Sequence, residues 1–87
     1  MQPRRPPPRE ATMRFDGVFD AAAALRAVAA IETGRTLVVD LTAVREFQDV
    51  AVARLAEAIA ARPGARVSLK GLRQHQTRLL RYFGVPA

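Results

Sequence analysis

The chain contains 87 residues, has no cysteine and carries a formal net charge of +6. This length allows one domain with a modest hydrophobic core and is too short for two. Without cysteine, a disulfide framework and thiolate chemistry are excluded. No apolar run approaches the roughly 20 residues that span a bilayer, and prolines follow the first arginines where a secretory signal would be apolar. We therefore expect a cytoplasmic protein.

The first ten residues, MQPRRPPPRE, include four prolines and three arginines. Prolines at this density cannot continue a helix or enter a central strand, and they favour an extended polyproline conformation. We predict a disordered Pro/Arg-rich tail over residues 1–10 and a folded domain over residues 11–87.

Alternating polar and apolar residues over positions 11–16, followed by Gly17, predict a short half-buried strand near an edge of a sheet. Asp20 can then cap a helix that runs to about residue 33, because its carboxylate can accept the unpaired N–H groups of the first turn. Gly34 would end this helix. Helical spacing places the following residues on its inward face: Ala21, Ala24, Leu25, Val28 and Ile31.

The sequence RTLVVDL, residues 35–41, is a nearly continuous apolar run with β-branched residues. It predicts a central strand covered on both faces. A second helix is expected from about Asp49 to Arg62, where Pro63 stops it. Its inward residues are predicted to be Val52, Leu55, Ala56 and Ile59.

Residues 65–71 resemble a third strand, and residues 72–84 a third helix with Leu72, Gln76, Leu79 and Phe83 in one stripe. Strands that alternate with helices of this length require crossover connections and hence a mostly parallel sheet. The predicted fold class is therefore α/β: a small single domain with a mixed, mostly parallel sheet and about three helices in βαβαβα order.

Catalytic chemistry has little support in the sequence. Asp40 ends an apolar strand as acidic residues do in nucleotide-binding proteins, but no glycine-rich phosphate loop exists, so a structural role in the next loop is favoured. His75 is the only histidine, and neither it nor Ser68 has partners at the spacing of a nucleophilic or metal site. We expect no enzyme activity, no metal and no cofactor.

All acidic residues lie at or before Glu57, so the last third of the chain is purely basic. This distribution could attract nucleic acid or an anionic membrane surface. Against nucleic acid, the chain has neither a helix-turn-helix signature nor a platform of interleaved aromatic residues. Ordinary solvated arginines on an Ala/Arg-rich chain are the favoured explanation, and the nucleic-acid or membrane binder stays as an alternative.

The motifs VVDLTAV and FQDVAVA, followed by VSLKGL and LLRYFGV, resemble those of the STAS domain, the sulfate transporter and anti-sigma factor antagonist family. The resemblance covers about residues 14–85 and rests on the order and spacing of motifs that are individually weak. It implies a small α/β domain that binds a protein partner. In bacterial anti-sigma factor antagonists of this family, the second serine of an Asp-Ser-Ser motif is phosphorylated by a partner kinase.

This sequence departs from that motif at the phosphorylated position. Asp49 matches the motif's aspartate, but Val50 and Ala51 replace its serines, and Ala51 matches the phosphoserine position. We expect Asp49 to be the N-cap of the second helix. Of the next two residues, Val50 is expected to turn inward and Ala51 outward. Two roles stay open for this pair: docking of a partner at an exposed apolar helix start, or simple packing beneath the loop.

The resulting hypothesis is an interaction domain that docks a protein through the loop over residues 42–48 and the first turns of the following helix. The partner implied by the resemblance is a kinase-like anti-sigma factor or a sensory complex. Alternatively, the chain is the STAS subunit of a bacterial lipid-transport ABC complex, and its partner is the ATPase of that complex. Self-association through an open sheet edge is a further candidate. The predicted partner-binding residues are Thr42, Arg45, Glu46, Asp49, Val50, Ala51, Arg54 and Glu57.

Overall fold

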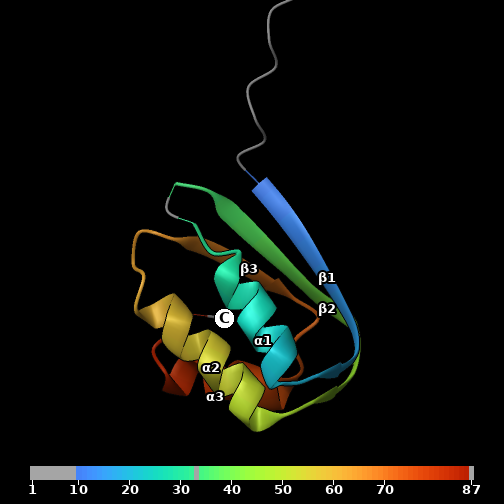
Figure 1. Cartoon of the computed structure of the whole chain (residues 1–87). Coiled ribbons are helices and arrows are strands. Elements are labelled where there is room, and N and C mark those ends of the chain that lie inside the picture. Colours follow the sequence, from blue (N-terminus) through green and yellow to red (C-terminus); the bar gives the residue numbers. More distant parts are fainter. Residues whose placement is uncertain (1–9, 33, 87) are drawn as a thin grey trace, which may run out of the picture.

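The computed structural model describes residues 10–32 and 34–86, and its strands and helices alternate along the chain (Figure 1). The predicted α/β class and the βαβαβα order are confirmed. The predicted tail lies outside the described residues except for Glu10, which begins the first strand. The elements are β1 (Glu10–Phe19), α1 (Ala21–Ala29), β2 (Thr36–Phe47), α2 (Asp49–Ala60), β3 (Arg66–Lys70) and α3 (Gln74–Tyr82).

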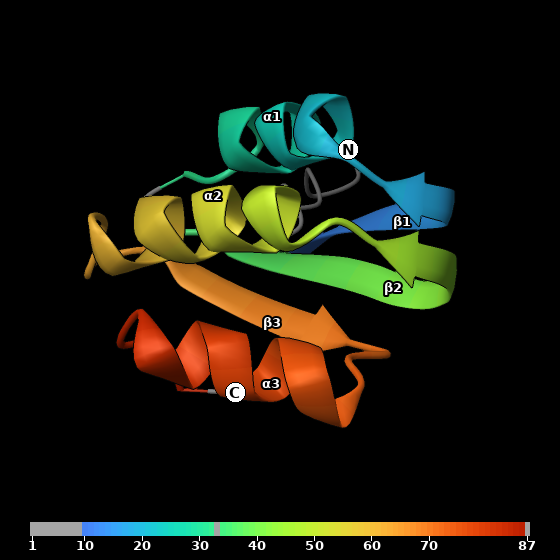
Figure 2. The ribbon, with the colours of Figure 1, turned by 90° about the horizontal axis from the view of Figure 1, so that it is seen from below.

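The three strands form a parallel sheet in the order β1-β2-β3, so β2 is central and β1 lies at an edge, as predicted. All three helices lie on the same side of this sheet (Figures 1 and 2). The expectation that helices cover β2 on both faces is therefore wrong. On the face without helices, Val38 is nevertheless buried between its register partners Thr12 and Ser68.

Strands β1 and β2 are longer than predicted because they continue to pair beyond two irregularities. The register shifts between Arg14 and Asp16 and again between Gly17 and Val18, and pairing continues to Phe19 and Phe47. Residues 42–47 are thus strand, and the predicted loop over residues 42–48 is wrong. Bulges of this kind insert a residue and bend a strand without ending its ladder, which the period-two pattern does not reveal.

Helix α1 begins as predicted, since Oδ1 of Asp20 accepts a hydrogen bond from the Ala23 N–H at 2.9 Å. The helix ends at Ala29, earlier than predicted, and its buried residues are Ala23, Ala24 and Ala27. Leu25 is 67% exposed, so its assignment to the core is wrong. In an alanine-rich helix several faces have similar apolar spacing, and close packing selects the face with the smallest side chains.

The core lies between the sheet and the helices. Its largest fully buried side chains come from every layer: Phe19, Val39, Leu41, Leu55 and Leu80. Phe15 and Phe19 pack edge to face with ring centroids 5.3 Å apart. In α3, Gln76 and Leu80 are buried, while the other predicted members of its apolar stripe, Leu72, Leu79 and Phe83, are partly buried against the core.

Candidate functional site

Two strand-to-helix junctions lie side by side at the carboxyl edge of the sheet, the β2–α2 junction and the β3–α3 junction. At the first, Gln48 is the N-cap of α2, and its side chain makes no capping hydrogen bond. Asp49 is the first helical residue, so the expectation that Asp49 caps the helix is wrong. Its carboxylate still lies in the first turn, where the positive end of the helix dipole stabilises negative charge.

The two residues that replace the family's serines point in opposite directions. Val50 is 54% exposed, whereas Ala51 is completely buried in the core. The predicted orientation was the reverse and is wrong. Ala51 lies one turn before Leu55, so the buried stripe of α2 includes it and leaves Val50 outside. Val50 is therefore the residue of this pair that a partner can contact.

Val50 continues along the outer side of α2 into the charged residues Arg54 and Glu57, which helical spacing places on the same side. Across from them on α1 stands Leu25, which sequence analysis had assigned to the core. A hollow of about 350 Å³ separates the two helices, lined by Ala21, Ala24, Leu25, Val28, Arg54, Glu57 and Ala58. We use the name α1–α2 face for the surface formed by Leu25, Arg54 and Glu57 at this hollow together with Val50, one helical turn before Arg54.

Three side-chain interactions bring the start of α3 to the β2–α2 junction. Nε2 of His75 lies 3.0 Å from Oδ1 of Asp49. Arg73 donates from Nη1 to the backbone oxygen of Arg45 at 3.4 Å, and its guanidinium lies 5.9 Å from the ring centroid of Phe47. Neither Arg73 nor His75 was predicted as part of the site, because their hydrogen-bond partners are at least 26 residues away in the chain.

Thr42 belongs to a separate group on the sheet face without helices. Oδ1 of Asp40 accepts the Thr42 hydroxyl at 2.6 Å and the Thr42 N–H at 3.0 Å. These two hydrogen bonds, with the nearby charges of Arg14 and Lys70, hold the pKa of Asp40 below its ordinary value of 3.8, against a smaller opposing effect of desolvation. The predicted structural role of Asp40 is confirmed by its bond to the Thr42 backbone, but the residues that follow Asp40 are strand and not the predicted loop.

The predicted site therefore separates into parts. Val50, Arg54 and Glu57 share the outer side of α2, and Asp49 adjoins them at its start. Arg45 and Glu46 are exposed on the last residues of β2. Thr42 stands apart with Asp40, and Ala51 is inaccessible to a partner.

Within residues 10–32 and 34–86, no three His, Cys, Asp or Glu side chains gather as they would around a metal ion. Of the helices that the structure describes, none has the length and apolar composition to cross a membrane.

A family model described as "Mlab, STAS domain" matches residues 4–86 of the chain. Searches of curated proteins and of solved structures gave no significant match.

Proposed function

The chain belongs to the STAS domain family, and we propose that it docks a protein partner through the α1–α2 face without a phosphoserine switch. STAS domains are in general interaction or regulatory domains and not enzymes. The proposal thus concerns which surface binds, what kind of partner it holds and whether binding is regulated.

The observation that carries this proposal is the exposure of Val50 at the first turn of α2, with Leu25 exposed on the neighbouring helix. They are two of the four large hydrophobic residues found exposed among those that the structure describes. Arg54 and Glu57 supply opposite charges beside them. An apolar centre with a polar rim is the usual composition of a protein interface.

The absence of a phosphate acceptor supports constitutive docking. A phosphoserine switch adds nearly two negative charges at a helix start. Here that position holds the buried, hydroxyl-free Ala51. The hydroxyl of Thr42, another predicted site residue, is hydrogen-bonded to Asp40. Such a surface suits a permanently assembled complex, which favours the STAS subunit of a bacterial lipid-transport ABC complex docked on its ATPase. Asp49, which matches the aspartate of the switch motif, keeps the anti-sigma factor antagonist-like role as the second candidate.

The test is affinity purification from the source cells with the tagged wild-type chain and a Val50→Asp variant. Aspartate is tolerated in the first turn of a helix, so this variant is expected to fold. We expect Val50→Asp to lose an ATPase or a kinase that the wild type retains at high salt, while Tyr82→Asp, a matched change at an 84% exposed position on α3, retains it. Equal recovery of that partner with Val50→Asp would overturn the proposed face.

The same purification distinguishes a nucleic-acid or anionic-membrane binder. Contacts with phosphates weaken steeply between about 50 and 200 mM salt. An apolar docking centre is much less sensitive to salt in this range. If the wild type and the Val50→Asp variant both retain their bound material at low salt and both lose it equally at high salt, phosphate binding by the basic C-terminal third is favoured.

A further inference from the structure

Strand β3 forms the outer edge of the sheet on the side away from β1. In the part of the chain that the structure describes, no strand pairs with its outer side. An edge strand presents alternate backbone N–H and C=O groups that another extended segment can pair with. The edge at β1 is open too, but no residue of β1 lines the two hollows beside β3 or the hollow between α1 and α2.

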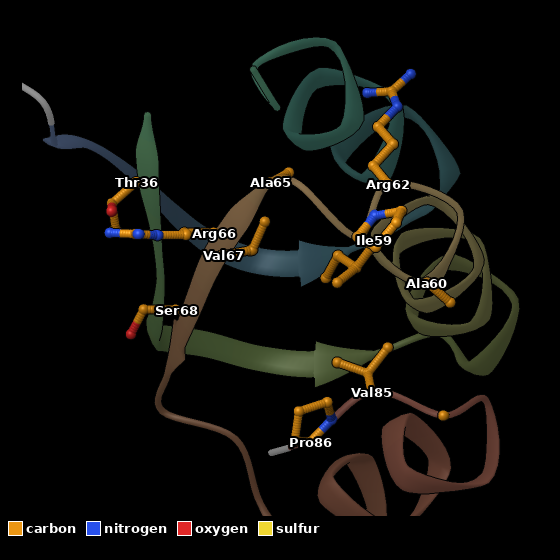
Figure 3. Close-up of a pocket in the computed structure, with 12 residues that line it drawn as sticks. Thr36, Ile59, Ala60, Arg62, Ala65, Arg66, Val67, Ser68, Val85 and Pro86 are labelled. Atoms are coloured by element: carbon orange, nitrogen blue, oxygen red, sulfur yellow. The ribbon is translucent and has the colours of Figure 1, made fainter. Parts of the chain in front are cut away.

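Two hollows of about 480 Å³ each lie along β3 and meet at Val67, Ser68 and Pro86. The first lies at the start of the strand, between the end of α2 and the C-terminal segment, where Val85 and Pro86 stand opposite β3 (Figure 3). The second continues past the end of the strand to Leu72 and Thr77. We name this continuous depression beside β3 the β3 trough.

The two faces of β3 differ in chemistry. Val67 and Leu69 point to the helix side, where they pack against the core. Both side chains are only partly buried, and both line the trough. Arg66, Ser68 and Lys70 point to the other face and are exposed. No acidic residue follows Glu57 in the sequence, so the charges of this edge are all positive.

We propose that the β3 edge binds an extended acidic segment of a partner protein, in which acidic and apolar residues alternate. A strand paired with β3 directs successive side chains to opposite faces. Its apolar residues would enter the trough beside Val67 and Leu69, and its acidic residues would stand next to Arg66 and Lys70 at cross-strand distance. Backbone pairing then supplies affinity and the alternation supplies specificity.

Charge selects this occupant over a second copy of the chain. Two copies paired through β3 in antiparallel register would bring the Arg66 of one next to the Lys70 of the other, and like charges directly opposite destabilise a pair of strands. Basic residues on an edge strand are also a common protection against self-pairing. The same residues attract an acidic strand.

The probe is a fluorescent peptide in which glutamate alternates with valine over about seven residues, a length that exceeds a typical strand of five or six. We expect saturable binding by fluorescence anisotropy, and binding at least about tenfold weaker when lysine replaces glutamate. Arg66→Glu should weaken binding of the glutamate peptide about fivefold and restore binding of the lysine peptide. The matched change Arg26→Glu, at an exposed position of α1 outside both proposed surfaces, should alter neither affinity. Equal affinity for both peptides would refute the proposal.

Backbone pairing has its own test, which charge alone cannot pass. Two peptides are N-methylated at alternate amides, one set on each edge of the added strand. One of them should lose binding and the other should keep it, because only one edge of the added strand pairs with β3. If both bind as the unmethylated peptide does, the segment is not a strand of the sheet.

Two further outcomes would also contradict the proposal. An oligothymidylate of equal charge that binds as tightly as the peptide would show attraction of negative charge without strand pairing. A concentration-dependent dimer displaced by the peptide, seen by sedimentation, would assign the edge to a second copy. The peptide should bind the Val50→Asp variant and the wild type with equal affinity. A result that contradicts docking at the α1–α2 face is therefore distinguished from one that contradicts strand binding at the β3 edge.

Discussion

Nε2 of His75 and Oδ1 of Asp49 lie 3.0 Å apart and join the first turns of α3 and α2. Both side chains are 65% exposed, so water weakens their interaction. We expect a double-mutant cycle with His75→Ala and Asp49→Ala to give a coupling free energy of about 0.2–1 kcal/mol at neutral pH by chemical denaturation.

The control for this cycle pairs Asp49→Ala with Arg78→Ala, an exposed position farther along α3. That pair should be additive within about 0.3–0.5 kcal/mol, the usual limit for residues without a contact. A coupling of the same size for both pairs would show that the His75–Asp49 contact contributes nothing specific.

Gly71 is required where the β3–α3 turn passes β2. Its φ is 83°, and a Cβ built on it would lie 2.5 Å from the backbone nitrogen of Thr42. Gly71→Ala should lower the free energy of unfolding by about 3 kcal/mol or more, because backbone atoms must move. Gly84 has a φ of 84° with nothing within 4 Å, so Gly84→Ala should cost only about 1–2 kcal/mol. Equal costs in urea denaturation would refute the predicted clash.

Gln76 is buried with an Oε1 that has no hydrogen-bond partner in the described part of the chain. An unsatisfied buried polar atom costs about 1–3 kcal/mol. Gln76→Met keeps a similar shape and removes this atom, so we expect the free energy of unfolding to rise by about 1 kcal/mol and Tm by about 4–8 °C. Gln74→Met, at an exposed position of the same helix, should leave Tm nearly unchanged. A lower Tm for Gln76→Met would show that the amide is needed.

The hydrogen bonds of Asp40 predict an acid-dependent loss of stability. Because the folded-state pKa lies below the ordinary value of 3.8, the unfolded chain takes up the proton first as pH falls. The stabilisation is complete above pH 3.8 and is lost as pH falls through the folded-state pKa. Thr42→Val removes the strongest cause, so its free energy of unfolding should fall less steeply below pH 3.8 than that of wild type. Identical slopes in the two proteins would contradict this assignment.

Much of the fold was predictable because local signals agreed with one another. The Asp20 cap, the apolar run of β2 and the proline after α2 each marked an element or a boundary within a few residues. Errors arose where the deciding contact was distant in sequence. The last residues of β2 remain a strand because β1 pairs with them across the register shifts.

The position of the β2–α2 junction was predictable, but the orientation of its side chains was not. The β2–α2 junction was identified from its motif, yet the exposure of Val50 and the burial of Ala51 were reversed. A local sequence does not specify how a helix is rotated about its axis when small residues occur on several faces. The rotation is set by packing against the sheet and the neighbouring helices, for which Ala51 is small enough.

The sequence by itself determined the alternation of strands and helices, the family and the lack of a phosphate acceptor at position 51, because these follow from periodicity, motif order and residue identity. Only the tertiary structure decided that Leu25 lines a hollow with Arg54 and Glu57, that His75 reaches Asp49 and that the β3 edge is open. Each of these depends on contacts between elements far apart in the chain, and such contacts are selected by the packing of the whole domain.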